Sequence, residues 1–255
     1  MGTLKWHLEN YEALPSTQLK AQELVNAQQI TQFTVIKAKK QTAGIGRKNR
    51  SWVSPLGGLW ASFIIPGEVS PKNYENFPIF LGLRLVQQCE DLFNIPFTLR
   101  WPNDLMVSSK KIGGIIIDNR VSDEVIKMMI VGLGLNINLE KKQFPSMLQK
   151  EVTSIFLETQ RIYSLDALTE ILAETIYQTF KEARSGRTAD IVSLWKEKSY
   201  SYKKEIQVIT NGKKLTGIEK GITPQGHLQF QTNEENLKTI IIEDLDSLRI
   251  VKKDE

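Results

Sequence analysis

Residues 111–138 read "KIGGIIIDNRVSDEVIKMMIVGLGLNIN", with two apolar runs on either side of the polar segment "RVSDE" at 120–124. Runs rich in isoleucine and valine predict strands, and a short polar connection between them predicts a turn. The stretch is therefore predicted to form an antiparallel hairpin. A hairpin of this length indicates a sheet with antiparallel pairs rather than an all-parallel one.

More elements are predicted on both sides of this hairpin. Strand-like apolar runs begin at Phe33, Leu59, Phe97 and Asp104. Apolar residues at helical spacing predict helices after Ser16 and Thr17, over 73–93 with Pro78 in the first turn, over 165–184 behind a Ser164 cap, and near Ala189. The predicted fold class is α+β, with a mixed or antiparallel sheet and flanking helices.

The character of the chain changes after Ser199. Short strands separated by turns follow, as in "GIEKGITPQGHLQF" at 217–230, and they predict a small all-β barrel. The predicted domains are residues 1–199, a catalytic-sized unit, and residues 200–255, the barrel. A β unit of this size usually needs support from a neighbour.

Bulk composition excludes several protein classes. The chain has 255 residues and a net charge of +4, which allows an anionic ligand without requiring one. Cys89 is the only cysteine, so no internal disulfide can form, and its helical spacing predicts a buried thiol. Two histidines and one cysteine argue against a structural zinc site. With neither a signal segment nor a long apolar run, we expect a cytoplasmic protein without a membrane partner.

The segment "QTAGIGRKNR" at 41–50 concentrates positive charge beside glycines. Residues 37–50 hold six lysines and arginines and no acidic residue. Gly44 and Gly46 let a ligand lie against backbone N–H groups, and Arg47 and Arg50 have the spacing to grip phosphate or carboxylate oxygens. The spacing matches neither the Walker-type phosphate loop nor the dinucleotide fingerprint. A nucleotide phosphate is one interpretation, and a solvated basic loop is the other.

Two more segments carry polar groups beside glycines. In "LRWPNDLMVSSKKIGGIII" at 99–117, Asn103 and Asp104 lie at a turn and Lys111 precedes a glycine pair. In "VGLGLNIN" at 131–138, the glycines indicate close backbone approach, and Asn136 has an amide for a base edge. A polar hairpin tip and a structural asparagine are the alternatives. Together the segments predict a site for a phosphorylated ligand, without naming a reaction.

These segments, in this order, resemble the biotin–protein ligases, and the C-terminal "GIEKGITPQGHLQF…SLR" resembles their SH3-like domain. The resemblance runs from about Ser16 to Arg249 and implies a class II synthetase-like catalytic domain. It implies that biotin and ATP, with Mg²⁺, form biotinyl-5′-AMP and pyrophosphate. The biotinyl group would then pass to a lysine of a biotin carboxyl carrier protein. We expect the monofunctional form, without an N-terminal DNA-binding domain.

The resemblance also assigns roles to individual residues. Those implied to bind biotin are Ser16, Thr17, Gln18, Gln41, Gly44, Ile45, Gly46, Arg47, Lys111 and Gly114. Those implied to bind ATP are Arg47, Arg50, Trp52, Asn103, Asp104, Lys111 and Asn136. Lys111, Arg47 and Arg50 are the expected catalytic residues, and no metal ligands are assigned. Gln18 stands where the family usually has asparagine, and Ile45 where many members have arginine, so one guanidinium contact to the adenylate is lost.

Other functions remain open at this point. A lipoate–protein ligase would share the fold and the acyl-adenylate chemistry, but its triple-glycine run is absent and "WPND" at 101–104 favours biotin. The basic segment would also suit nucleic acid, yet it is short and has only Trp52 nearby for stacking, which argues against DNA as a partner. A homodimer is compatible with the resemblance, and the sequence does not select the acceptor carboxylase.

Overall fold

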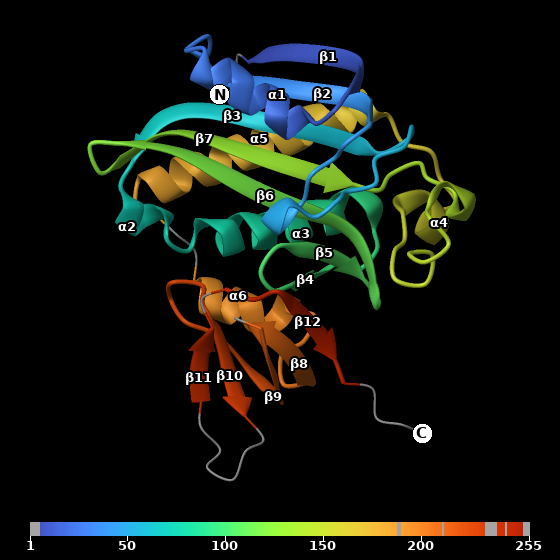
Figure 1. Cartoon of the computed structure of the whole chain (residues 1–255), viewed down its shortest axis with the longest axis vertical. Helices are drawn as coiled ribbons and strands as arrows, with labels where there is room; N and C mark the ends of the chain where they lie inside the picture. Colours follow the sequence, from blue (N-terminus) through green and yellow to red (C-terminus); the bar gives the residue numbers. More distant parts are fainter. Residues whose placement is uncertain (1–5, 188–189, 211, 233–238, 243, 252–255) are drawn as a thin grey trace.

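The fold consists of a seven-stranded sheet and a five-stranded sheet, with helices packed on both (Figure 1). The structure is a computed structural model that describes residues 6–187, 190–210, 212–232, 239–242 and 244–251. The outer ends of the two predicted domains, and Ala189 near the predicted helix start, lie outside these residues. Among the described helices, none combines the length and apolarity that crossing a bilayer requires.

The larger sheet has the strand order β1-β2-β3-β7-β6-β5-β4. Its strands are β1 (His7–Leu14), β2 (Thr34–Gln41), β3 (Leu59–Val69), β4 (Thr98–Arg100), β5 (Asp104–Val107), β6 (Lys110–Ser122) and β7 (Val125–Leu135). Only β1 and β2 pair in parallel, and the remaining neighbours are antiparallel. The predicted hairpin is confirmed as β6–β7, at the centre of a mixed sheet.

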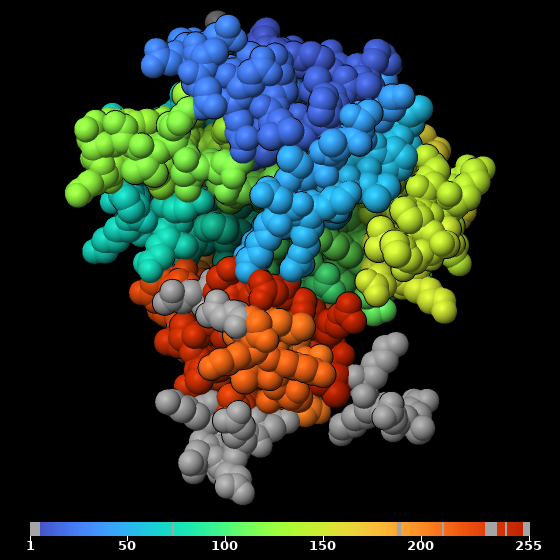
Figure 2. Space-filling view, viewed as in Figure 1, coloured from blue at the N-terminus to red at the C-terminus, as the bar shows by residue number. Residues whose placement is uncertain are grey.

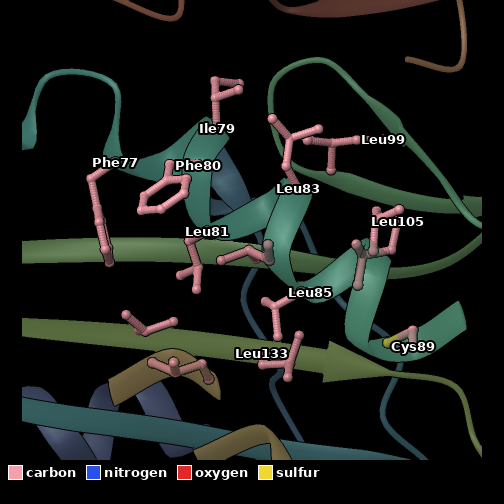
Figure 3. Packing of buried hydrophobic residues seen from close by; sticks show 14 of the residues in the cluster. Phe77, Ile79, Phe80, Leu81, Leu83, Leu85, Cys89, Leu99, Leu105 and Leu133 are labelled. Carbon is pink, nitrogen blue, oxygen red and sulfur yellow. The ribbon is translucent and has the colours of Figure 1, made fainter. Parts of the chain in front are cut away.

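The two faces of this sheet differ: one packs on the main core, and the other carries α1 and the cavity described below. Side chains reach the two faces in turn because successive residues of a strand point to opposite sides. Phe63 of β3, Val131 and Leu133 of β7, and Ile115 of β6 point to the main core beneath α3 and α5. Figure 3 shows side chains of α3 directed toward Leu133 and its neighbours, with Cys89 among them. Cys89 is buried as predicted, and burial raises its thiol pKa to about 12. The other face carries α1 and the candidate site.

Six helices are described around the sheets. They are α1 (Thr17–Asn26), α2 (Pro71–Tyr74), α3 (Phe77–Phe93), α4 (Ile155–Thr159), α5 (Leu165–Arg184) and α6 (Ile191–Lys198). The helical segment predicted over 73–93 is confirmed, with one interruption between α2 and α3, where Asn76 adopts φ −94° and ψ 0°. Pro78 does lie in the first turn of α3, and Ser164 caps α5 as predicted.

The second sheet is antiparallel, with the order β11-β10-β9-β8-β12. Its strands are β8 (Glu205–Thr210), β9 (Lys213–Ile222), β10 (Leu228–Thr232), β11 (Thr239–Ile242) and β12 (Ser247–Ile250). Helix α6 packs on it, and the carboxylate of Glu219 in β9 accepts hydrogen bonds from Trp195, Ser199 and Ser201. Its buried side chains join the main core, so the neighbour supplies the support that its size demands.

Candidate functional site

One cavity of about 940 Å³ opens on the α1 face of the larger sheet. Every predicted site residue except Gly44 lines it. These are Ser16, Thr17, Gln18, Gln41, Ile45, Gly46, Arg47, Arg50, Trp52, Asn103, Asp104, Lys111, Gly114 and Asn136. Segments from four distant parts of the sequence therefore converge on one space, as expected if they serve one ligand or two ligands in contact.

One end of the cavity is buried and neutral. Ser16 caps α1, where its hydroxyl accepts a hydrogen bond from the Gln18 backbone N–H at 3.2 Å. The Thr17 and Gln18 side chains follow in the first turn, and both residues are only 4 % exposed. The buried Ser62 hydroxyl on β3 lies 2.9 Å from both Thr17 Oγ1 and Gln18 Oε1. We call Ser16, Thr17, Gln18, Gln41 and Ser62 the neutral end.

Gln41 at the end of β2 ties the neutral end to the glycine loop. Its Oε1 accepts from the Thr17 backbone N–H at 2.8 Å and from the Thr17 hydroxyl at 3.2 Å. Its Nε2 donates to Ser54 Oγ at 2.7 Å. Gly44 stands beside this contact, and its carbonyl accepts from the Trp52 backbone N–H at 2.8 Å. Gly44 thus shapes the cavity wall from behind rather than lining it.

Lys111 forms the charged centre of the cavity. Its ammonium lies 2.5 Å from one oxygen of Asp104, and Arg100 binds the other oxygen at 2.6 Å. Burial alone would raise the pKa of Asp104, but the charges of Lys111 and Arg100 outweigh it and lower the pKa. Two cations share one carboxylate, so the group keeps a net positive charge that can face an anionic ligand.

The Trp52 side chain lines the cavity beside Lys111 and Gly134. The Lys111 ammonium stands 4.9 Å from the centre of its ring system, a cation–π contact. A Cβ at Gly134 would lie only 2.6 Å from Trp52 Nε1, so the glycine in β7 makes room for the indole. Trp52 Nε1 is buried and has no hydrogen-bond partner among the described residues. The indole N–H therefore faces the β7 backbone at Gly134, and the ring, which lines the cavity, is what Trp52 presents to a ligand.

Asn103 and Asn136 line the cavity while supporting its walls. Asn103 Nδ2 donates to the Ile115 carbonyl at 2.6 Å, across β5 and β6. Asn136 is 3 % exposed, and its Nδ2 donates to the Thr153 carbonyl at 2.9 Å. Both amide nitrogens thus hold backbone in place, in line with the structural interpretation of these asparagines. What each residue offers a ligand is its amide oxygen.

The opposite end of the cavity is exposed and charged. Arg47 and Lys48, in a short 3-10 turn over Arg47–Asn49, form ion pairs with Asp244, and Lys48 Nζ also lies 2.7 Å from Asp246. The Arg50 guanidinium donates to the Asp246 carbonyl. Figure 2 shows the loop in light blue reaching the red C-terminal segment. We call Arg47, Lys48, Arg50, Asp244 and Asp246 the charged end.

The sequence alone missed five polar contributors to this site. They are Ser62, Arg100, Asp118, Asp244 and Asp246. A hydroxyl inside the apolar run "LWASFII" and a carboxylate closing "KIGGIIID" are local signals that would have singled out Ser62 and Asp118. The two C-terminal aspartates have no such signal, because their partners lie almost two hundred residues earlier in the chain.

This arrangement suits a reaction between two anions. A ligand with a neutral polar head can enter the neutral end, and phosphates can reach the cations at the charged end. Lys111, at the centre, is placed to offset the repulsion between a carboxylate and a phosphate. Holding both reactants in one cavity also removes much of the entropic cost of their encounter.

Comparisons with known proteins agree with this geometry. Residues 11–136 match the biotin/lipoate A/B protein ligase family. The bifunctional ligase/repressor BirA of Bacillus subtilis is 27 % identical over 241 residues, which cover 94 % of this chain and 74 % of that protein. A biotin–protein ligase of Schizosaccharomyces pombe is 35 % identical over 129 residues, 42 % of this chain and 20 % of that one. A solved biotin protein ligase of Aquifex aeolicus, in complex with biotin and ATP, superposes with a TM-score of 0.80 at 27 % identity, covering 96 % of this chain and 99 % of that chain.

Proposed function

The chain belongs to the biotin/lipoate A/B protein ligase family, and on that premise we propose how its cavity carries out biotin–protein ligation. The protein is an ATP-dependent ligase that activates biotin to biotinyl-5′-AMP and transfers the biotinyl group to a lysine of a carrier protein. The observation that carries the assignment of roles is the single cavity, with a neutral end, a charged end and Lys111 between them.

In the first step, a biotin carboxylate oxygen attacks the α-phosphorus of ATP. A new oxygen–phosphorus bond forms, and the bond to pyrophosphate breaks. Lys111 would stand between the carboxylate and the α-phosphate, where its charge stabilises the negative charge that builds up on the α-phosphoryl oxygens. Asp104 and Arg100 hold Lys111 from the protein side. Arg47 and Arg50 would bind phosphate, and this requires them to leave Asp244 and Asp246.

In the second step, the amine of the acceptor lysine attacks the acyl carbon of the adenylate, an amide bond forms, and AMP leaves. The mixed anhydride must be kept from water until the acceptor arrives. The loop residues Gly44, Ile45, Gly46 and Arg47 would cover it. Ile45 contributes only apolar cover where many relatives have an arginine, so retention of the adenylate falls more heavily on Arg47.

The neutral end would hold the ureido head of biotin. A ureido group has two N–H donors and one carbonyl acceptor, and Ser16, Thr17, Gln18 and Gln41 provide hydroxyls and amides to match it. Gly114 on β6 would leave room for the rest of biotin. The nucleotide base would lie against the Trp52 ring, with Asn136, Asn103 and Asp104 supporting its surroundings.

Magnesium enters this proposal as part of the MgATP substrate. The part of the chain that the structure describes has no group of three or more histidine, cysteine or acidic side chains to hold a metal ion. Asp104, the carboxylate in the cavity centre, is already shared by two cations. Mg²⁺ commonly binds through substrate phosphates and water, which suits these surroundings.

The proposal extends to the domains and the partner. We take residues 1–199 as the catalytic unit and 200–255 as an SH3-like barrel. Five antiparallel strands in a compact unit, with Asp244 and Asp246 at the charged end, support this division. The carrier protein would present its lysine at the mouth of the cavity. A homodimer, a cytoplasmic location and the absence of a DNA partner stay predictions, which sedimentation, fractionation and a DNA-retention assay would test.

One incubation tests the function. The purified chain is mixed with biotin, MgATP and a biotin carboxyl carrier domain, and the carrier is then weighed intact by mass spectrometry. The expected result is one added biotinyl group, with pyrophosphate released in equal amount. A parallel incubation with lipoate should leave the carrier unmodified. Transfer of lipoate instead of biotin would move the protein to the lipoate branch of the family, and transfer of neither would overturn the proposal.

A further inference from the structure

Gln18 is held at both ends of its side-chain amide. Its Nε2 donates to Asp118 Oδ2 at 2.7 Å and to the Ile130 carbonyl at 3.4 Å. Its Oε1 accepts from the Ser62 hydroxyl at 2.9 Å. The residue is 4 % exposed, so the orientation of this amide is part of the buried floor of the cavity.

Asp118 sets that orientation, since an ionised carboxylate only accepts hydrogen bonds. If the Gln18 amide were flipped, its oxygen would face the Asp118 oxygen at hydrogen-bonding distance, with repulsion in place of a bond. The same Asp118 oxygen also accepts from Gln22 Nε2 at 2.6 Å, and this second bond anchors the carboxylate to α1. Both N–H groups of the Gln18 amide therefore donate to the protein, to Asp118 and to the Ile130 carbonyl, and neither is free for a ligand.

The oxygen of Gln18 is the atom left for a ligand. It has two lone pairs, and Ser62 uses at most one of them. Gly132 permits this placement, because a Cβ at that position would lie 2.5 Å from Gln18 Oε1. Gln18, Ser62, Ile116 and Gly132 all line this part of the cavity. The cavity thus presents an acceptor here, and an acceptor selects a ligand that donates.

We propose that Asp118 is a positioning residue that makes the neutral end specific for a ureido N–H, by holding the Gln18 carbonyl oxygen toward the ligand. This inference rests on the proposed function, because it assumes that the ureido head of biotin binds at the neutral end. Asp118 does not line the cavity itself, and it acts only through Gln18.

The test uses Asp118→Asn, in which the new amide can accept or donate and so frees Gln18 to flip. The KM for biotin should rise about tenfold, the size of one hydrogen bond, while kcat at saturating biotin stays unchanged. The sharper readout is discrimination against the two cyclic carbamate analogues of biotin, in which one ureido N–H is replaced by oxygen. The wild type should reject one of the two analogues, and D118N should lose most of that rejection, because a flipped Gln18 donates to the ring oxygen.

Two controls separate positioning from a general loss of structure. Gln22→Ala removes the other partner of Asp118 but leaves the Gln18 amide fixed, so it should keep the wild-type biotin KM and discrimination. In a Gln18→Ala background, adding Asp118→Asn should change nothing further. Should D118N not fold, D118S makes the same comparison, because a hydroxyl also donates or accepts.

Each outcome has a clear meaning. The proposal is overturned if D118N keeps wild-type discrimination, if its effect persists in the Gln18→Ala background, or if Q22A shows the same loss. The proposed function fails separately, since it requires the wild type to transfer biotin at all. A wild type that biotinylates its carrier, with a D118N variant that is indistinguishable from it, would remove only the positioning role.

Discussion

The two ends of the cavity are built in opposite ways. The neutral end is closed by hydrogen bonds between buried side chains, with Ser62 fully buried and Thr17 and Gln18 nearly so. The charged end is closed by ion pairs between exposed side chains, with one-third of the Arg47 side chain and more than half of Asp244 open to solvent. The first end is ready for its ligand, whereas the second must exchange protein partners for it.

The difference also separates the physical forces at the two ends. Buried neutral hydrogen bonds depend little on salt, and losing a partner leaves a group unsatisfied at a cost of about 1–3 kcal/mol. Exposed ion pairs are worth about 0.2–1 kcal/mol and are screened by salt. We call the ion pairs of Arg47 and Lys48 with Asp244 and Asp246 the clasp. Changes at the neutral end should therefore alter biotin binding strongly, and changes in the clasp should alter ATP binding weakly.

The largest effect is expected at Lys111, where the two ends meet. Lys111→Ala should slow biotin-dependent pyrophosphate release by about 10²–10³-fold, the usual effect of removing one group that stabilises developing charge. Arg100 remains to pair the half-buried Asp104, so the melting temperature should fall only slightly. Lys110→Ala is the matched control, because that neighbour is exposed and does not line the cavity. Normal pyrophosphate release by K111A would show that the central role is wrong.

The next effect concerns the support of the charged end. Glu219 is fully buried and accepts hydrogen bonds from Trp195, Ser199 and Ser201, so it joins α6 to β9. Glu219→Ala leaves two buried donors, Trp195 and Ser201, unsatisfied and should cost about 3 kcal/mol of unfolding free energy, whereas Glu219→Gln keeps an acceptor and should cost about 1 kcal/mol or less. E219A should also lower the ATP KM while leaving the biotin KM nearly unchanged, because a loosened second sheet holds Asp244 and Asp246 less firmly against the cations that ATP phosphates need. Equal changes in both KM values would mean that the sheet does not act through the charged end.

The same residue gives a pH dependence with a defined sign. Burial raises the pKa of Glu219 above its ordinary value of 4.5, although its hydrogen bonds oppose the rise. Between 4.5 and the raised pKa, the folded state keeps a proton that the unfolded state releases. This contribution to stability is fully present below pH 4.5 and is lost as the pH rises through the folded pKa. Urea unfolding across this range should show that slope in the wild type and a flatter one in E219Q.

Much of this organisation could be predicted from the sequence. The hairpin followed from two apolar runs, the α5 cap from Ser164, and the location of the site from glycines beside cations. Strand β1 was missed because it is an edge strand with mostly exposed or half-buried residues, so it has no apolar pattern to detect. A local hydrophobic pattern arises only where a segment buries side chains in the core, and every residue of β1 is exposed or half-buried.

The contacts that complete the site could not be predicted in the same way. Gln18 meets Asp118 across 100 residues, and Lys48 meets Asp246 across 198. Such pairs depend on how β6 and the second sheet are placed in space, which no local spacing encodes. By the family resemblance, Gln18 stands where asparagine is usual. The structure explains why the longer side chain fits, because it lies over Gly132 and reaches Asp118.

A third effect tests the neutral end directly. Gln41→Ala removes the acceptor of the Thr17 backbone N–H and hydroxyl. The biotin KM should rise about tenfold or more, consistent with one or two unsatisfied buried groups. The ATP KM should stay near its wild-type value, and the size of the biotin effect should not change with salt. Gln29→Ala, at an exposed position after α1, is the control. An equal loss of ATP binding would contradict the separation of the two ends.

The smallest effect belongs to the clasp at the charged end. In the double variant Asp244→Asn, Asp246→Asn, Arg47 and Lys48 no longer have carboxylates that compete with ATP phosphates, so at low salt the ATP KM should fall about two- to fivefold. At about 0.15 M salt the screening length is roughly 8 Å, so the difference in ATP KM between the double variant and the wild type should become smaller. The biotin KM should not respond in either protein. Asp123→Asn with Glu124→Gln, in the β6–β7 turn, makes the same change in net charge away from the cavity and should behave as the wild type. A rise in the ATP KM of the clasp variant would mean that the aspartates hold the arginines ready for phosphate, and the charged end would then be as preorganised as the neutral one.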